Sequence, residues 1–216
     1  MKAMILAAGR GERMMSLTKD CPKPLLMLQG KPLIVWQIER LANAGFKEIV
    51  INIAYLGSMI EETLGDGSKW GVKISYSNEQ ENALESAGGI IKALDLLGKK
   101  FLVVNSDLWC DYIPQNSYDL GKKVAHLIMV PNPEHNKQGD FGLMGHDITL
   151  SSGERYTFSG IGYYSKELFE GLEQGRRKLG NVLREAIKDG LVSGELYKGI
   201  WRDVGTPERL KEIESI

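Results

Sequence analysis

Glycine and basic residues are concentrated in one N-terminal segment, LAAGRGERMMSLTKDCPKPLL, residues 6–26. Gly9 and Gly11 follow an apolar run, and glycine lets backbone N–H groups approach phosphate oxygens closely. Three of the basic side chains in this segment, Arg10, Arg13 and Lys23, bring positive charge that can pair with phosphate. Together these residues predict a cradle for a triphosphate.

Two common nucleotide-binding motifs do not fit this segment. A dinucleotide fingerprint that starts at Gly9 needs a small residue at position 14 and an acidic residue near position 29, where the chain has Met14 and Gln29. The G-x-x-x-x-G-K-[ST] loop is absent from the sequence. If only the glycines are considered, the alternative to a triphosphate site is an ordinary flexible turn after a strand.

Two aspartates far apart in the chain are candidates for metal ligands. Asp107 follows the apolar run FLVVNS, and Asp203 lies in WRDVGT. Mg²⁺ prefers oxygen ligands and is commonly held by one or two carboxylates together with substrate phosphates. The pair therefore predicts a Mg²⁺ site. Helix capping is the alternative for each, with Asp203 before the helix expected to begin near Pro207.

The segment NALESAGGIIKAL, residues 82–94, is a candidate for the nucleobase site. Its small residues would let a flat base lie against the backbone, whose polar groups between Ala83 and Gly88 could bind the edge of the base. Packing of glycines at an ordinary helix start is the alternative. Asp140 in QGDFG and Thr157 in YTFSGIG are candidates for binding sugar hydroxyls, although aspartate between glycines is also typical of a plain turn.

The elements that must position these residues alternate between β-branched apolar runs and amphipathic stretches. Strands are expected at residues 3–8, 48–53, 72–76, 101–104 and 124–130, and helices at about 32–44, 89–97, 179–188 and from 207 onward. This order predicts an α/β fold with a Rossmann-like mixed sheet flanked by helices, whose strand-end loops bind ligands. Residues 1–216 are expected to form a single domain, with a nucleotide-binding part at about 1–130 and a small acceptor-side β subdomain at about 131–200.

Composition excludes several function classes. The net charge of -1 gives no overall field that would favour nucleic acid or an anionic membrane, and no stretch approaches the roughly 20 apolar residues that span a bilayer. The two cysteines, Cys21 and Cys110, form no metal-binding or disulfide pattern. The expected location is the cytoplasm, and the sequence indicates no required protein partner.

Four motifs together resemble the sugar-1-phosphate nucleotidyltransferase family: LAAGRGERM, PKPLL, NSD at 105–107 and WRDVGTPERL at 201–210. Within that family the chain is most similar to the bacterial uridylyltransferases that act on N-acetylmuramate 1-phosphate. The resemblance implies a GT-A-like fold and a Mg²⁺-dependent reaction of UTP with that sugar phosphate. The products would be a nucleotide sugar and pyrophosphate, in peptidoglycan recycling.

The resemblance also implies roles for individual residues. The catalytic set would be Arg13, Lys23, Asp107 and Asp203, with both aspartates on the metal. The nucleotide would be bound by Leu6, Ala7, Ala8, Gly9, Gly11, Arg13, Asn78, Ala83, Glu85 and Gly88. The sugar phosphate would be bound by Lys23, Asp140, Thr157 and Gly160. The chain departs from the family at Met15 and Ser16, where arginine and proline are usual, and this puts the rigidity of the loop in question.

Three further hypotheses remain open at this point. Two keep the reaction and change the ligands, namely mannose-1-phosphate guanylyltransferase and phosphocholine cytidylyltransferase, because base specificity depends on a few hydrogen bonds. The third is a regulator that binds nucleotide without turning it over.

Overall fold

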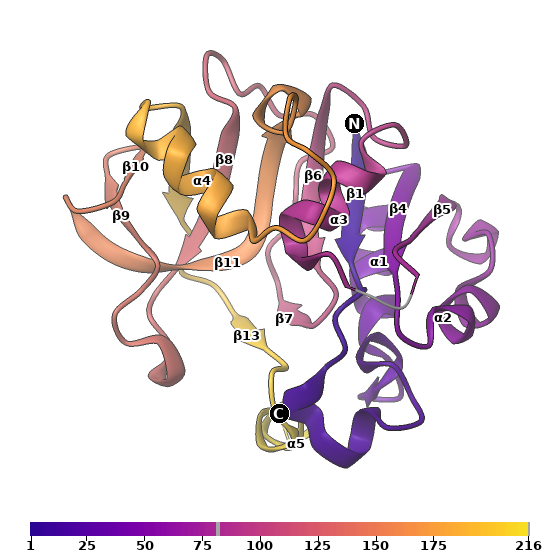
Figure 1. The fold of residues 1–216 in the computed structure, drawn as a ribbon. Coiled ribbons are helices and arrows are strands. Elements are labelled where there is room, and N and C mark those ends of the chain that lie inside the picture. The colour runs from indigo at the N-terminus through magenta and orange to yellow at the C-terminus, as the bar shows by residue number, and fades with distance from the viewer. Residues whose placement is uncertain (81–82, 216) are drawn as a thin grey trace.

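The computed structural model describes residues 1–80 and 83–215, which are organised around one nine-stranded sheet (Figure 1). The strand order is β5-β4-β1-β6-β11-β8-β12-β10-β9. The bounds are β1 Lys2–Leu6, β4 Glu48–Ile53, β5 Lys73–Asn78, β6 Lys100–Asn105, β8 Ala125–Val130, β9 Phe141–Met144, β10 Asp147–Thr149, β11 Glu154–Ser165 and β12 Val192–Leu196. Two small ribbons pair β2 Met27–Leu28 with β3 Lys31–Pro32, and β7 Leu108–Cys110 with β13 Trp201–Asp203.

The first half of the sheet is parallel and buried on both faces. β1 lies between β4 and β6, with Ile5 opposite both Ile51 and Val104. Strands covered on both faces are expected to be continuous apolar runs, which is how these three read in the sequence. β11 then runs antiparallel to both β6 and β8, and so joins the parallel half to the rest of the sheet.

Helices cover both faces of the sheet. The helices in the described part of the chain are α1 Leu33–Asn43, α2 Gly57–Leu64, α3 Glu85–Ala93, α4 Leu179–Lys188 and α5 Pro207–Glu214, of which α5 packs against residues 12–18 and β2. α1 packs Ile34 and Ile38 into the core cluster on one face, while α3 and α4 lie together on the other, where Ile90 and Leu183 are buried (Figure 1). No helix in the described part of the chain has both the length and the apolar character needed to cross a bilayer.

The predicted α/β class and mixed sheet are confirmed, and three details of the prediction were wrong. The helix expected at 89–97 begins four residues earlier, at Glu85, and α2 was not predicted. Residues 154–165 form one long strand rather than several short ones. The reason lies in its glycines, since the pairing of β11 with β8 changes register between Phe158 and Gly162, so one strand bends where the sequence indicates a turn.

Candidate nucleotide and acceptor site

A cleft of about 720 Å³ opens where the parallel strands end. β1, β4, β5 and β6 end at Leu6, Ile53, Asn78 and Asn105, and the segments that follow these strands form the walls of the cleft. Carboxyl ends of parallel strands are the usual ligand-binding edge of such sheets. The cleft is lined by residues 6–13, 23–24, 52, 54–55, 79, 83–86, 105–107, 176 and 205.

Gly11 fixes the shape of the glycine-rich loop. It has φ of 67° and begins a 3₁₀ helix, Glu12–Thr18, in which the Met14 N–H donates to the Gly11 carbonyl at 2.8 Å. A Cβ at this position would lie 2.9 Å from Cβ of Lys23. Glycine is therefore needed both for the left-handed backbone and for the close approach of the loop to Lys23.

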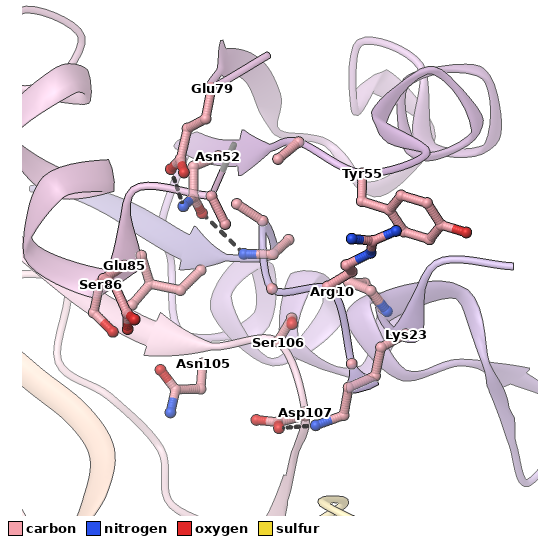
Figure 2. Close-up of a pocket in the computed structure, with 18 of the residues that line it drawn as sticks. Arg10, Lys23, Asn52, Tyr55, Glu79, Glu85, Ser86, Asn105, Ser106 and Asp107 are labelled. Carbon is pink, nitrogen blue, oxygen red and sulfur yellow. Dashed lines mark hydrogen bonds and ion pairs between the residues drawn. The ribbon is translucent and has the colours of Figure 1, made fainter. Parts of the chain in front are cut away.

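The Lys23 and Asp107 side chains form an ion pair inside the cleft (Figure 2). Lys23 comes from the segment after the glycine-rich loop, and Asp107 comes from the end of β6, so two distant parts of the chain meet here. Both side chains are largely buried, with exposed fractions of 12% and 21%. At the rim, the Arg10 guanidinium lies over the Tyr55 ring, 5.0 Å from its centroid (Figure 2).

A buried polar network connects the glycine-rich loop to the segment before α3. The Asn52 side chain accepts from the Ala7 N–H at 2.9 Å and donates to Glu79 at 2.7 Å (Figure 2). The other Glu79 oxygen accepts from the Leu84 N–H at 2.7 Å. Because Asn52 and Glu79 are buried and their polar atoms are partnered, the network holds two walls of the cleft in a fixed relation.

Asp203 is brought beside Asp107 by the small β7–β13 ribbon. In this ribbon Asp203 lies opposite Leu108, and the Val204 N–H donates to the Asp107 carbonyl at 2.8 Å. The Asp203 carboxylate does not line the cleft itself. It pairs with Arg209 of α5 at 2.5 Å and lies 3.0 Å from His135 Nε2. A Cβ on Gly205, which does line the cleft, would lie 2.9 Å from Asp203 Oδ2.

The donor set at this place fits Mg²⁺. Asp107, in the turn before β7, and Asp203, at the end of β13, carry carboxylates that can supply hard oxygen ligands, and each is balanced by a cation in this structure. Within residues 1–80 and 83–215, three or more His, Cys, Asp or Glu side chains nowhere gather into a metal-binding group. Two carboxylates are sufficient when substrate phosphates complete the coordination.

A second pocket of about 320 Å³ adjoins the cleft on the side of α4. The two share Leu6, Glu85, Ser86 and Asn105. The remaining lining residues of the second pocket are Val103, Asp140, Phe141, Phe158, Gly160, Tyr164, Lys178, Leu179, Gly180, Leu183 and Arg184. One oxygen of the Asp140 carboxylate accepts from the Phe158 N–H at 2.8 Å.

Most of the residues predicted from the sequence lie around these two spaces. Leu6, Ala7, Ala8, Gly9, Gly11, Arg13, Lys23, Ala83, Glu85 and Asp107 line the cleft. Asp140 and Gly160 line the second pocket. The structure does not bring Asn78, Gly88 or Thr157 to either lining.

These three have structural partners instead. Gly88 packs against the 175–177 backbone, where a Cβ would collide with the Gly175 carbonyl oxygen, and its N–H donates to the Arg177 carbonyl at 3.2 Å. The Asn78 side chain accepts from the Gln80 N–H. The buried Thr157 hydroxyl donates to Asn132 and accepts from Asn136.

Sequence reasoning missed several lining residues. Asn52 and Glu79 are polar residues within or directly after apolar runs, and an asparagine inside EIVINI was the available signal. Tyr55, Asn105 and Ser106 follow strand ends that had been predicted. No signal pointed to Arg176, which reaches the cleft because the backbone of residue 177 pairs with residues 84, 87 and 88.

Relatives among known sequences include nucleotidyltransferases that act on sugar 1-phosphates. The N-acetylmuramate alpha-1-phosphate uridylyltransferase of Neisseria meningitidis is 50% identical over 226 residues, which cover 100% of this chain and 98% of the relative. The mannose-1-phosphate guanyltransferase of Saccharomyces cerevisiae is 31% identical over 229 residues, which cover 96% of this chain and 62% of the relative. The chain therefore spans less than two thirds of the length of that guanyltransferase.

Solved structures with the same fold are more distant in sequence. HddC of Yersinia pseudotuberculosis, solved with GMP-PN, has a TM-score of 0.81 at 21% identity, covering 99% of this chain and 98% of that one. The inositol-1-phosphate CTP transferase of T. maritima has a TM-score of 0.80 at 18% identity, covering 99% and 94%. A family model described as "Nucleotidyl transferase" matches residues 2–215. On the sequence match, this chain belongs to the nucleotidyl transferase family.

Proposed function

We propose that this protein transfers a uridylyl group from UTP to N-acetylmuramate 1-phosphate, giving the UDP-sugar and pyrophosphate. The observation that carries the proposal is the junction of two pockets: a glycine-rich, basic cleft and a second pocket share the end of β1 and the start of α3. The choice of substrates rests on the Neisseria relative, which matches the whole chain at 50% identity.

In the proposed reaction an oxygen of the sugar phosphate attacks the α-phosphorus of UTP. A new P–O bond forms, the bond between the α-phosphorus and the bridging oxygen breaks, and pyrophosphate leaves in line. The attacking phosphate is already an anion near neutral pH, so no general base is needed. The protein has to align two anions and balance their charge, which is the main contribution of enzymes to phosphoryl-type transfer.

Each part of the site has a separate role in the proposed reaction. The loop around Gly9 and Gly11 offers backbone N–H groups to the triphosphate, and Arg13 would balance the charge of the leaving pyrophosphate. Lys23 would hold the sugar phosphate, exchanging its present partner Asp107 for the incoming anion. Asp107 and Asp203 would hold Mg²⁺, which when bound supplies a Lewis acid and neutralises phosphate charge.

A second candidate keeps the site and changes the substrates to GTP and mannose 1-phosphate. The observation in its favour is the yeast guanyltransferase, which is 31% identical over 96% of this chain. The shared reaction requires the same phosphate loop, so only the base and sugar contacts would differ. We place the reaction in the cytoplasm, in the recycling of peptidoglycan sugars, which follows from the proposed acceptor.

The test is pyrophosphate release by the purified protein, with and without MgCl₂. UTP, GTP and CTP are each combined with N-acetylmuramate 1-phosphate and with mannose 1-phosphate, and CTP also with phosphocholine. Release with UTP and the muramate phosphate supports the proposal, whereas release with another pair replaces the substrates. If no pair releases pyrophosphate but UTP still binds, the protein is a nucleotide-binding regulator.

Asp107→Asn is expected to lower turnover by roughly 100-fold or more while the protein stays folded, because the amide cannot supply the anionic ligand. The measurement is kcat at saturating MgCl₂, together with a thermal unfolding curve. Asp95→Asn serves as a matched control, since the Asp95 side chain is fully exposed at 101%. Near-normal turnover of Asp107→Asn would remove this residue from the mechanism.

A further inference from the structure

The wall of the second pocket that α4 provides is positively charged. Lys178 directly precedes α4, and Arg184 lies within it, and both side chains line the pocket. Neither forms an ion pair with a carboxylate in the part of the chain that the structure describes. Two arginines directly precede Lys178: Arg176 is already paired with Glu85 at 2.9 Å, and Arg177 does not line the pocket.

Arg184 is held in position by contacts that leave most of its donors free. Its guanidinium carbon lies 5.4 Å from the centroid of the Phe141 ring, and Nη1 donates to the Gly180 carbonyl at 3.1 Å. Phe141 and Gly180 also line the pocket. A guanidinium stacked on a ring and fixed by one hydrogen bond is preorganised to bind a planar anion through its other N–H groups.

Tyr164 of β11 also lines the pocket, but its hydroxyl oxygen is completely buried. A Cβ on Gly162 would come within 2.7 Å of this oxygen, so the hydroxyl packs against the backbone of β11. Because a group of the size of water cannot reach the oxygen, Tyr164 shapes the wall of the pocket, and the groups that can bind a charge there are Lys178 and Arg184.

Two acidic residues line the same pocket as these cations. Glu85 pairs with Arg176, and one oxygen of Asp140 accepts from the Phe158 N–H. The pocket therefore combines apolar surface from Phe141, Phe158 and Leu179 with two cations that lack a carboxylate partner among the described residues. This combination suits a sugar phosphate with a second anionic group, carried on an apolar arm. The arm would contact the apolar surface, and the anionic group would contact the cations.

We propose that Lys178 and Arg184 bind a carboxylate of the acceptor sugar and so select acceptors that carry one. The inference rests on the proposed function and extends it. N-acetylmuramate is N-acetylglucosamine bearing a lactyl ether, whose carboxylate is ionised at neutral pH. Lys23 would then hold the phosphate of the acceptor at the cleft. Lys178 and Arg184 would hold the carboxylate of the same molecule at α4.

The experiment compares two acceptors of nearly equal size, N-acetylmuramate 1-phosphate and its lactyl methyl ester, which lacks the carboxylate charge. Affinity is measured by calorimetry with α,β-imido UTP present, and kcat/KM by pyrophosphate release with UTP. For the unsubstituted protein we expect the acid to be preferred by about tenfold or more, the range of a hydrogen-bonded charge. Lys178→Met and Arg184→Met should each reduce that preference, with kcat/KM for the ester within about twofold of the unsubstituted protein.

Lys178→Arg should retain the preference, and Lys188→Met, at the far end of α4, should leave both acceptors unchanged. Equal losses with acid and ester would show that the two cations bind the phosphate or support the fold, and would overturn the inference. Equal affinity of the unsubstituted protein for acid and ester would overturn it as well. If pyrophosphate is not released but calorimetry still shows the preference for the acid, the proposed function fails and the carboxylate site stands.

Discussion

Met15 has backbone angles that a residue with a Cβ rarely adopts, φ 53° and ψ -122°, inside the loop that contains Arg13. Its side chain is 75% exposed, so no packing compensates for the strain. Such conformations cost about 1–3 kcal/mol and are often found near functional sites. This is the position at which the sequence departs from the family it resembles, and the departure coincides with local strain.

Because of this strain, we expect glycine at position 15 to give a more stable protein than alanine, which is the reverse of the usual order. At an ordinary exposed position alanine is more stabilising than glycine, because glycine has more conformational freedom in the unfolded chain. At Met15 we expect the Met15→Gly protein to be more stable than Met15→Ala by about 1 kcal/mol, since only glycine accepts these angles without strain. Urea unfolding of both variants measures the difference, and an alanine variant as stable as the glycine one would show that the loop relaxes.

The residues of the candidate site differ in how far sequence alone could predict them. Gly11, Lys23 and Asp107 could be found because their chemistry requires those residue types in a recognisable segment. Asn52 stands out as a polar residue in an apolar run, but its role and that of Glu79 depend on the register that places β4 beside β1 and β5. In the sequence, Lys178 and Arg184 look like ordinary surface residues. Only the position of α4 beside the second pocket shows that they line it.

At the scale of elements, α5 holds Asp203, one of the two proposed metal ligands. Thr206 caps the helix by accepting from the Arg209 N–H, and Arg209 in turn holds the Asp203 carboxylate. Arg209 and Asp203 are 18% and 19% exposed, so their charges are mostly removed from water. The helix therefore sets the orientation of a carboxylate that would otherwise be free to rotate.

Removal of this cation should destabilise the protein in a way that Mg²⁺ partly reverses. Arg209→Met leaves the Asp203 carboxylate with only His135 beside it, and we expect a loss of roughly 2 kcal/mol in unfolding free energy without metal. Addition of MgCl₂ should then raise the melting temperature of the variant more than that of the unsubstituted protein, because metal replaces the lost counter-charge. Lys211→Met, in the same helix, is the control. An equal shift in both proteins would argue against Asp203 as a ligand.

Elements were predictable where burial imposes a regular pattern. β1, β4 and β6 are buried on both faces and appear as apolar runs, and α1 shows a clear helical period. α2 was missed because it has only eight residues, of which Gly57, Ile60 and Leu64 are buried. β11 was interpreted as separate pieces because its glycines, which serve a bend and the close packing of Tyr164, look like turn residues.

At the scale of the whole molecule, the order of strands prevents division of the chain at residue 130. β11 comes from residues 154–165, yet it lies between β6 and β8. A fragment of residues 1–130 would expose the inner edges of β6 and β8, whose backbone groups would lose their partners. We expect this fragment to lack a cooperative unfolding transition by circular dichroism, in contrast to the full chain. A folded fragment would show that the first part is an independent unit.

The stability of the molecule should also fall in mild acid because of His126. Burial lowers the pKa of this histidine to about 4 from its ordinary 6.5, with a smaller effect from His146. Glu195 lies 3.8 Å from the ring and would favour the charged form, but its side chain is 46% exposed, so water screens it and burial dominates. His126 is thus neutral in the native state near pH 5, while the unfolded chain already binds a proton there.

The contribution of His126 is fully present above pH 6.5 and is lost as the pH falls toward 4. Between pH 7 and pH 5 the loss should be about 2 kcal/mol, by the relation of 1.36 kcal/mol to one pKa unit. Urea unfolding at the two pH values measures it. Between pH 7 and pH 5, His126→Gln should lose less unfolding free energy than the unsubstituted protein. His146→Gln should lose about as much as the unsubstituted protein. Identical pH dependence of all three would place the acid sensitivity elsewhere.

The Arg177 carbonyl accepts from the N–H groups of both Ala87 and Gly88, and the Arg177 N–H donates to the Leu84 carbonyl. One side of this short ladder faces the nucleotide cleft, and the other continues into the wall that Lys178 and Arg184 provide. A ligand that orders one side also orders the other, so the two substrates should strengthen each other's binding by the same factor, as thermodynamic reciprocity requires. A single compound that reaches across the ladder would gain from both effects, which makes bisubstrate molecules the natural inhibitors of this architecture.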